Sequence, residues 1–312
     1  MARTDLAVGV FGVGALGRHH TRILATLPGA RLVGIYDANP ETARAVGGEH
    51  GARVFAAHGE LAREIEAAVV AVPTVAHREV AGDLLGRGIH VLVEKPIAVD
   101  LAEADELVAA ARAAGRILAV GHVEFFNPAV EALVGLGLAP RFVEIERLGV
   151  FSPRSLDVDV LLDLMIHDLQ ILHALDPSVV LEIRATGIAV LSERIDIANV
   201  RLELASGLVA NLTASRVSAE KTRKLRAFFR NRYLSLDYQA QEIKGFRLEQ
   251  QGEQRRIVPA DVAVEKAEPL RRELEGFVAA ARGQPARLVS GEEGRRALAT
   301  ALAVVEAARG VC

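Results

Sequence analysis

Cysteine and tryptophan are almost absent from this chain of 312 residues. The only cysteine is Cys312, the last residue, and there is no tryptophan. One cysteine can form neither an intrachain disulfide nor a metal site of several thiolates, so the composition favours a reducing, cytoplasmic location. Aromatic residues make up only 4% of the chain, whereas 51% of it is hydrophobic. We therefore expect a globular core of alanine, valine, leucine and isoleucine.

The sequence also lacks a strong charge and a long apolar run. The formal net charge is −3, and no uninterrupted hydrophobic segment reaches the roughly 20 residues that span a bilayer. We predict no membrane segment and no general nucleic-acid-binding surface, although a local basic pocket is compatible with this charge. The first residues run directly into a predicted strand, so we also expect no signal peptide.

Residues 5–122 alternate between apolar runs and helical stretches. The predicted strands are 6–12, 31–37, 67–73, 90–95 and 117–122, and the helical stretches include 15–27 and 101–115. Short β-branched runs separated by helices are typical of a parallel sheet covered on both faces. The first part of the chain is therefore predicted to be an α/β domain with a doubly wound parallel sheet.

From residue 122 the pattern changes to alternating polar and apolar residues. One predicted helix, 158–175, precedes strands at 180–191, 196–205, 207–217, 225–238 and 242–250, and helices at 269–282 and 291–309 end the chain. A period of two predicts a large, mostly antiparallel sheet with one packed face. We predict two domains, 1–121 and 122–312, the second of α+β type, and expect its open sheet face to join subunits into a homodimer or homotetramer.

The first predicted strand ends in a glycine turn, Gly12-Val13-Gly14-Ala15-Leu16-Gly17, and Asp37 closes the second. This pattern, with a strand before it, a helix after it and an acid about 20 residues on, indicates a dinucleotide site. Its glycines allow a tight turn, a close approach to pyrophosphate and close helix packing, and the helix N-terminus faces the phosphates. Asp37 is expected to bind the ribose hydroxyls. Because no arginine follows Asp37, NAD is favoured over NADP.

Two further strand ends supply candidate cofactor residues. Pro73, Thr74 and His77 follow the strand at 67–73, and Glu94-Lys95-Pro96 ends the strand at 90–95. Ligands of open α/β sheets lie beyond the carboxyl ends of the strands. We expect the Lys95 ammonium to point into that crevice, and His77 either to touch the cofactor or to cap or pack on its own helix.

The predicted helix at 158–175 is apolar on every side, yet it carries Asp163 and His167 four residues apart. Residues at i and i+4 share a helix face, and Asp159 continues the same stripe. Burying an unpaired carboxylate is costly. The stripe therefore either faces a polar cavity or forms a satisfied network in the core.

Lys95 favours the first alternative. Oxidation of a secondary alcohol without zinc requires a base of suitable pKa, most often histidine, and a cation near the developing alkoxide. His167 and Lys95 can supply these functions. We predict no metal site, because there is no cysteine cluster and one Asp/His pair does not provide three zinc ligands.

The glycine turn, Glu94-Lys95-Pro96 and Asp163-x-x-x-His167, taken in order, resemble the glucose–fructose oxidoreductase / inositol dehydrogenase (Gfo/Idh/MocA) family over nearly the whole chain. The resemblance implies a Rossmann domain followed by an antiparallel α/β domain. It also implies Lys95, Asp163 and His167 as the catalytic and substrate-contacting set. Family members differ in whether the lysine or the histidine is the base, so both stay open, with His167 preferred.

The stretches "DVDVLLDLMIHD", "GHVEFFNP" and "NLTASR" are similar to a subgroup that oxidises UDP-N-acetylglucosamine at C3, in a pathway to 3-amino sugars of lipid A. Relatives in that subgroup usually have arginine where this chain has Phe125. Arg147, Arg154 and Arg216 are therefore candidate partners of a diphosphate. Asn127 is a candidate partner of a sugar hydroxyl, or alternatively starts the helix after it.

Three other interpretations stay open at this point. The chain could be a dehydrogenase of a free sugar or inositol, or a reductase of carbonyl or imine compounds. It could also be a non-catalytic NAD sensor, since the family includes transcriptional corepressors. Such regulators do not need the Lys95, Asp163 and His167 set, and its presence here favours an enzyme acting on a sugar alcohol.

Overall fold

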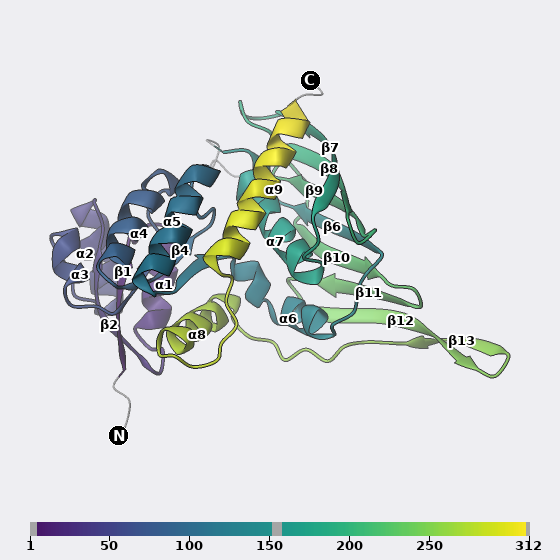
Figure 1. Cartoon of the computed structure of the whole chain (residues 1–312), viewed down its shortest axis with the longest axis horizontal. Coiled ribbons are helices and arrows are strands. Elements are labelled where there is room, and N and C mark those ends of the chain that lie inside the picture. Colours follow the sequence, from purple (N-terminus) through teal and green to yellow (C-terminus); the bar gives the residue numbers. More distant parts are fainter. Residues whose placement is uncertain (1–4, 152–157, 310–312) are drawn as a thin grey trace. The chain divides into compact units, whose positions relative to one another are not determined.

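The computed structural model describes residues 5–151 and 158–309 and divides into two compact units (Figure 1). The first unit comprises the described residues up to Val123 together with Glu268–Arg296. The second comprises the described residues from Glu124 to Ala267 and from Ala297 onward. The long helix at the end of the chain starts in the first unit and ends in the second.

The first unit is built on a parallel sheet of five strands in the order β2-β1-β3-β4-β5. Its strands are β1 (Leu6–Phe11), β2 (Ala30–Tyr36), β3 (Ala67–Val70), β4 (His90–Glu94) and β5 (Leu118–Gly121). The strand order reverses between β1 and β3, which is where such sheets bind ligands beyond their carboxyl ends. The prediction of a doubly wound parallel sheet is confirmed.

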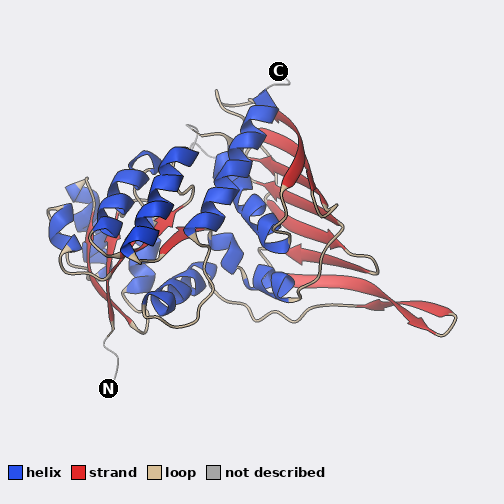
Figure 2. Ribbon diagram, viewed as in Figure 1, coloured by secondary structure: helices blue, strands red, loops and turns tan. Residues whose placement is uncertain are grey.

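Helices accompany this sheet in the described part of the unit (Figure 2). They are α1 (Gly17–Leu24), α2 (Pro40–His50), α3 (His58–Ala62), α4 (His77–Gly86), α5 (Leu101–Ala114) and α8 (Pro269–Ala281). Local signals set several of their ends. The Asn39 and Asp100 side chains accept backbone N–H groups at the starts of α2 and α5, and Gly115 ends α5 in a left-handed conformation.

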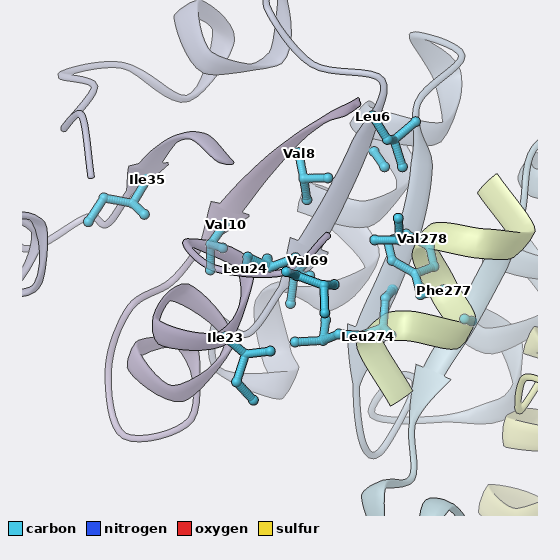
Figure 3. Packing of buried hydrophobic residues seen from close by; sticks show 14 of the residues in the cluster. Leu6, Val8, Val10, Ile23, Leu24, Ile35, Val69, Leu274, Phe277 and Val278 are labelled. Carbon is cyan, nitrogen blue, oxygen red and sulfur yellow. The ribbon is translucent and has the colours of Figure 1, made fainter. Parts of the chain in front are cut away.

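Helix α8 lies within the residues predicted for the second domain, but it groups with the first unit. Leu274, Phe277 and Val278 of α8 are buried in one hydrophobic cluster with residues of β1, α1 and β3 (Figure 3). Their apolar surface therefore completes the core of the parallel sheet, although the segment Glu124–Ala267 of the second unit intervenes in the sequence. The amphipathic pattern of α8 predicted the helix but not the sheet on which it packs.

The second unit contains an eight-stranded sheet in the order β13-β12-β11-β10-β6-β9-β8-β7. Its strands are β6 (Phe142–Leu148), β7 (Val180–Ile188), β8 (Ile197–Leu204), β9 (Val209–Ser215), β10 (Thr222–Phe228), β11 (Arg232–Asp237), β12 (Glu242–Gln251) and β13 (Gln254–Pro259). Among the described strands of this second sheet, only β6 and β9 pair in parallel. The prediction of a large, mostly antiparallel sheet is confirmed.

Alternating burial gives this sheet one packed face, covered by α6 (Pro128–Gly135), α7 (Ile166–Leu175) and the second-unit part of α9 (Gly291–Arg309) (Figure 2). One strand prediction is wrong. Residues 225–238 form parts of two strands, β10 and β11, joined in a hairpin by a turn whose only common turn residue is Asn231. The central strand β6 was missed despite the alternation of buried Val143 and Ile145 along it.

Two absences concern the described residues only. No helix there combines the length and the apolar content needed to cross a bilayer. No group of three or more histidine, cysteine, aspartate and glutamate side chains in the same residues is arranged to hold a metal ion.

Candidate functional site

The glycine turn after β1 has room for a ligand on its outer side. Gly12 has a φ of +81°, and a Cβ atom there would lie 2.7 Å from the backbone of Ala71. A Cβ atom at Gly17 would lie 1.8 Å from the carbonyl oxygen of Gly12, so these two glycines are required by close packing. A Cβ atom at Gly14 would meet nothing within 4 Å. The open space at Gly14 fits the predicted cradle for a pyrophosphate.

The remaining residues of the turn differ in exposure. Ala15 and Leu16 are exposed, and α1 begins after them at Gly17. The Val13 side chain is buried, so only the backbone of Val13 is available to a ligand or to a neighbouring side chain. Its N–H group is already used within the unit.

Asp37, at the end of β2, accepts the Val13 N–H at 2.7 Å through Oδ2 and the Asn39 N–H at 2.8 Å through Oδ1. Asp37 therefore ties the second strand to the glycine turn, a role that sequence reasoning missed. Each carboxylate oxygen keeps a second lone pair, and the residue is half-buried. The carboxylate can therefore hold the turn and still accept hydrogen bonds from ribose hydroxyls.

His77 connects the ends of two neighbouring strands. Its Nδ1 lies 2.9 Å from the Pro96 carbonyl oxygen, and its Nε2 lies 3.0 Å from the Val72 carbonyl oxygen. The side chain is buried, and this burial lowers the pKa of His77 below its ordinary value. This geometry corresponds to the packing alternative for His77. Pro73 is exposed and Thr74 is half-buried, in the 3₁₀ turn that follows β3.

Glu94, the last residue of β4, faces inward. Its Oε1 lies 2.7 Å from Nε2 of buried His20, and its Oε2 accepts the Lys95 N–H at 3.2 Å. A Cβ atom at Gly121 would lie 3.0 Å from Oε2, so the glycine leaves room for the carboxylate. Glu94 thus fixes the backbone from which the Lys95 side chain starts.

Lys95 is half-buried at the carboxyl edge of the sheet. Burial, together with the positive charge of Lys95, lowers the pKa of His122 to about 3. The ammonium group therefore acts on the residue that follows β5, within the same unit. Lys95 follows β4 at the carboxyl edge of the sheet, and the direction of its ammonium group into the crevice stays a prediction.

In the second unit, Asp163 and His167 lie where two helix types meet. Leu161–Met165 form a π-helical turn, in which the Ile166 N–H reaches back to the Leu161 carbonyl, and α7 continues from Ile166. The prediction of one regular helix over 158–175 is wrong for this turn. Residues four apart remain close to one face in either geometry, and π turns are frequent at functional sites. Asp163 is half-buried and His167 is buried.

The buried carboxylates of this region are Asp159 and Asp168 rather than Asp163. Asp159 was expected to continue the polar stripe, but it accepts the Ile195 N–H at 3.0 Å and the Arg309 guanidinium at 2.8 Å. Asp168 forms a two-pronged pair with buried Arg147, with N···O distances of 2.7–3.1 Å. Both acids are thus satisfied within the unit, which leaves Asp163 and His167 as the polar pair of the stripe.

Comparison with known proteins shows the family to which the chain belongs. Residues 6–122 match the family model GFO_IDH_MocA, an oxidoreductase family with an NAD-binding Rossmann fold. A UDP-N-acetylglucosamine 3-dehydrogenase from Acidithiobacillus ferrooxidans is 38% identical over 307 residues, which are 96% of each chain. The chain belongs to the GFO_IDH_MocA family.

Solved structures agree with this assignment. A structure of the UDP-N-acetylglucosamine 3-dehydrogenase from Acidithiobacillus ferrooxidans has a TM-score of 0.92 at 37% identity over 99% of both chains. An inositol 2-dehydrogenase from Rhizobium meliloti is 28% identical over 67% of this chain and 68% of its own. The family resemblance, the NAD-binding Rossmann domain and the assignment as a dehydrogenase, all predicted from the motifs, are confirmed.

Within this family member, three of the predicted substrate residues serve the fold. Asn127 caps α6 by accepting the Ala129 N–H at 3.1 Å and donates to the Tyr238 carbonyl at 2.9 Å. Arg216 donates to buried Asp196 at 2.7 Å. Arg147 is held by Asp168 and by Glu124 at 2.7 Å. Arg154 lies outside the described residues.

Arg147 stays protonated although it is buried. Burial alone would lower the pKa of Arg147, but the carboxylates of Asp168 and Glu124 raise it well above its ordinary value. Sequence reasoning missed Asp168 and Glu124. The available signal was the alternation of β6, which puts Arg147 on the same packed face as Val143 and Ile145 and so requires a buried acid as partner.

Proposed function

We propose that this protein oxidises the C3 hydroxyl of UDP-N-acetylglucosamine and transfers the hydride to NAD. The observation that supports this most strongly is the 38% identity, over 96% of both chains, to an enzyme named for that reaction. If either protein had an additional domain, the alignment would not cover 96% of both chains. The TM-score of 0.92 to a structure of the same enzyme supports a shared fold over the whole length.

We assign the chemistry to Lys95, Asp163 and His167. When bound, NAD supplies the hydride acceptor. Removal of the hydroxyl proton falls to His167, with Lys95 as the alternative base, because an imidazole titrates near neutral pH. If His167 is the base, the Lys95 ammonium stabilises the developing alkoxide. Asp163 orients the imidazole or accepts a sugar hydroxyl.

The first unit supports NAD binding through its own residues. The open space at Gly14 can accept the pyrophosphate, Gly12 and Gly17 allow the tight turn beside it, and the first turn of α1 presents N–H groups to it. Asp37 has acceptor capacity for the adenosine ribose and would repel a 2′-phosphate, which favours NAD over NADP. Thr74 and exposed Pro73 extend the same carboxyl edge.

Three finer proposals accompany this function. The 3-keto sugar product suits a transaminase that makes 3-amino sugars, so we place the reaction in lipid A synthesis. We propose a homodimer or homotetramer, supported by Leu181 and Ile188, which are apolar and exposed on the edge strand β7. We also propose a cytoplasmic location, because the chain has a single cysteine.

The substrate is tested by incubating the protein with NAD and following NADH absorbance across a panel of UDP-sugars, free sugars and inositol. We expect NADH with UDP-N-acetylglucosamine and little with N-acetylglucosamine itself. Inositol is the main alternative substrate, because an inositol 2-dehydrogenase from Rhizobium meliloti is similar to this chain. Turnover of inositol but not of the UDP-sugar would replace our substrate assignment.

The catalytic residues are tested in the same assay. Lys95→Ala and His167→Ala should each lower kcat by roughly 10²-fold or more while NAD affinity stays near that of the wild type. Lys244→Ala, an exposed lysine of β12, and His173→Ala, on the same helix as His167, are matched controls and should keep most of the activity. Full activity of Lys95→Ala and His167→Ala would identify a different catalytic set.

A further inference from the structure

Asp159 lies at the start of the π-helical turn that carries Asp163, but its side chain does not cap that turn. An aspartate at the start of a helix normally accepts N–H groups of the helix's own first turn. The buried Asp159 carboxylate instead accepts a hydrogen bond from the Ile195 N–H at 3.0 Å through Oδ1 and one from the Arg309 guanidinium at 2.8 Å through Oδ2. The side chain therefore connects the turn to two other segments of the second unit.

The backbone around Asp159 strengthens this connection. The Val160 N–H donates to the Ile195 carbonyl at 2.9 Å, so Ile195 holds two consecutive residues at the start of the helix. The Asp159 carbonyl, in turn, accepts the Leu162 N–H at 3.0 Å and the Asp163 N–H at 3.1 Å. Asp163 is therefore linked to Ile195 through a single residue.

The loop that contains Ile195 is itself well anchored. This loop joins β7 to β8, and it folds around Asp196, whose side chain is fully buried. Asp196 accepts three backbone N–H groups of the loop at 2.7–3.0 Å, and Arg216 donates to it through Nε at 2.7 Å. Asp159 is thus attached to a segment that has its own network of hydrogen bonds.

The π turn is attached to the rest of the second unit at both ends. At its carboxyl end it continues into α7, which is held by the pair of Asp168 with buried Arg147. At its amino end it is held by Asp159. Asp163 and His167 lie between these two attachments. π turns are rare, occur mostly as single turns inside α-helices, and are frequent at functional sites.

We propose that Asp159 is a positioning residue, which holds the amino end of the π turn against Ile195 and thereby keeps Asp163 in place relative to His167. The inference rests on the proposed catalytic roles of Asp163 and His167. Without the attachment, the first turn is free to fray or to tighten into α-helical geometry. Either change moves Asp163 relative to His167, although residues four apart stay near one face. A misplacement of roughly 1 Å can cost a factor of about 10² in rate.

The two partners of Asp159 differ in exposure. Ile195 is 8% exposed, whereas the Arg309 side chain is 57% exposed. A buried N–H that loses its acceptor is costly, while an exposed ion pair contributes little. The bond to the Ile195 N–H therefore provides most of the attachment, and Arg309 can turn to water when the carboxylate is replaced.

The first test compares Asp159→Ala, which removes the acceptor, with Asp159→Asn, which keeps an oxygen for the Ile195 N–H. Asp159→Ala should lower kcat roughly tenfold or more. The KM for NAD should change less than about threefold, because the proposed NAD residues lie in the first unit. Asp159→Asn and Arg309→Ala should each keep kcat within about threefold of the wild type. A loss in Asp159→Asn as large as that in Asp159→Ala overturns the proposal.

Asp176→Ala separates positioning from general destabilisation. Asp176 follows α7 at its other end, and its carboxylate accepts the Ser178 N–H at 3.0 Å and the Ser206 hydroxyl. Asp159→Ala and Asp176→Ala each remove an anchoring acid next to the same helical segment, so both should lower the melting temperature. At an assay temperature well below both melting temperatures, Asp176→Ala should keep most of its turnover. A parallel loss of kcat in the two variants overturns the proposal.

The most specific test places Asp159→Ala in a protein that already carries Asp163→Asn. If Asp159 acts by positioning Asp163, the double variant should have a kcat within about threefold of that of Asp163→Asn alone, because the positioned carboxylate is already gone. A purely structural role predicts instead that the two losses multiply. Multiplied losses would therefore overturn the proposal.

Failure of the proposed function gives a different result. If Asp163→Asn turns over like the wild type, the role of Asp163 is wrong, and this inference falls with it. If Asp163→Asn is impaired but Asp159→Ala turns over like the wild type, the proposed function stands and only the role of Asp159 is overturned.

Discussion

Arg147 and Asp168 in the second unit are buried as a charged pair, whereas His122 and Glu273 in the first unit are buried as neutral groups. Both arrangements avoid an isolated buried charge. The second unit does so by placing opposite charges 2.7 Å apart, and the first does so by shifting protonation.

The difference matters for the residues beside these groups. Burial raises the pKa of Asp168 above its ordinary value, although the charge of Arg147 opposes this shift. The pair therefore keeps both charges and holds α7, and with it His167, in place at neutral and alkaline pH, but not in strong acid. Neutral groups that can gain or lose a proton respond to pH. We therefore expect alkali to perturb the surroundings of Lys95 before those of His167.

The largest effect is expected from breaking the charged pair. Asp168→Ala leaves Arg147 buried with only Glu124 as a close acidic partner and should lower the free energy of unfolding by about 3–5 kcal/mol. Urea denaturation followed by circular dichroism measures this change. The matched control is Glu144→Ala, which removes a half-exposed partner of Arg226 and should cost no more than about 1 kcal/mol.

Replacing both members of the pair sharpens the same comparison. The double variant Arg147→Met, Asp168→Leu should recover most of the stability that Asp168→Ala loses, since a well-packed apolar pair often substitutes for a buried ion pair. If the double variant is no more stable than Asp168→Ala, packing rather than charge accounts for the loss.

A smaller effect concerns acid. The folded-state pKa of His122 is about 3, below the unfolded value of 6.5. As the pH falls below 6.5, the unfolded chain takes up a proton that the folded chain does not, so stability is lost at up to about 1.4 kcal/mol per pH unit. Between pH 7 and pH 5 this amounts to about 2 kcal/mol.

His122→Gln should remove that part of the acid sensitivity, as measured by the free energy of unfolding at the two pH values. His19→Gln, at an exposed position, should behave like the wild type. Equal acid sensitivity in His122→Gln and in the wild type would show that other groups carry the proton uptake.

Asp37 differs both from the buried ion pair and from the buried neutral groups. It is half-buried, and backbone N–H groups donate hydrogen bonds to its carboxylate. Asp37→Ala should weaken NAD binding about tenfold, which corresponds to about 1.4 kcal/mol, because it removes the ribose acceptor. NADP binding should weaken less. Fluorescence titration with both cofactors measures the difference, and an equal loss for NAD and NADP would mean that the bond to the Val13 N–H is what matters.

The smallest effect is predicted for Asn127. Asn127→Ala removes the cap of α6 and should cost about 1 kcal/mol of stability, with no change in the KM for the sugar, because both amide atoms already have partners within the second unit. A severalfold rise in KM without a loss of stability would instead support the contact with a sugar hydroxyl.

Local sequence patterns were sufficient for much of the fold. The glycine turn, the five parallel strands and the helix at 269–282 follow from residue spacing and from the alternation of apolar runs. What failed depends on distant contacts. The packing of α8 on the first sheet is decided by Phe277 and its neighbours in that core. The division of 225–238 into two strands depends on pairing with β6 and β12.

The candidate site shows the same limit. Asp163, His167 and Lys95 could be selected because their residue types suit an alcohol oxidation and they occur in recognisable motifs. The partners of His77, Glu94, Arg147 and Arg216 could not be predicted, because each partner is distant in the sequence or is a backbone carbonyl. Glu273 appeared in the sequence as one charge among several on an amphipathic helix, and only its burial beside Glu94 makes it unusual.

The central claim is that the hydride comes from C3 of the sugar. UDP-N-acetylglucosamine carrying deuterium only at C3 should be incubated with the protein and NAD, and the NADH formed should be analysed by mass spectrometry. Our account predicts one deuterium in each NADH. Unlabelled NADH formed from the labelled sugar would contradict it.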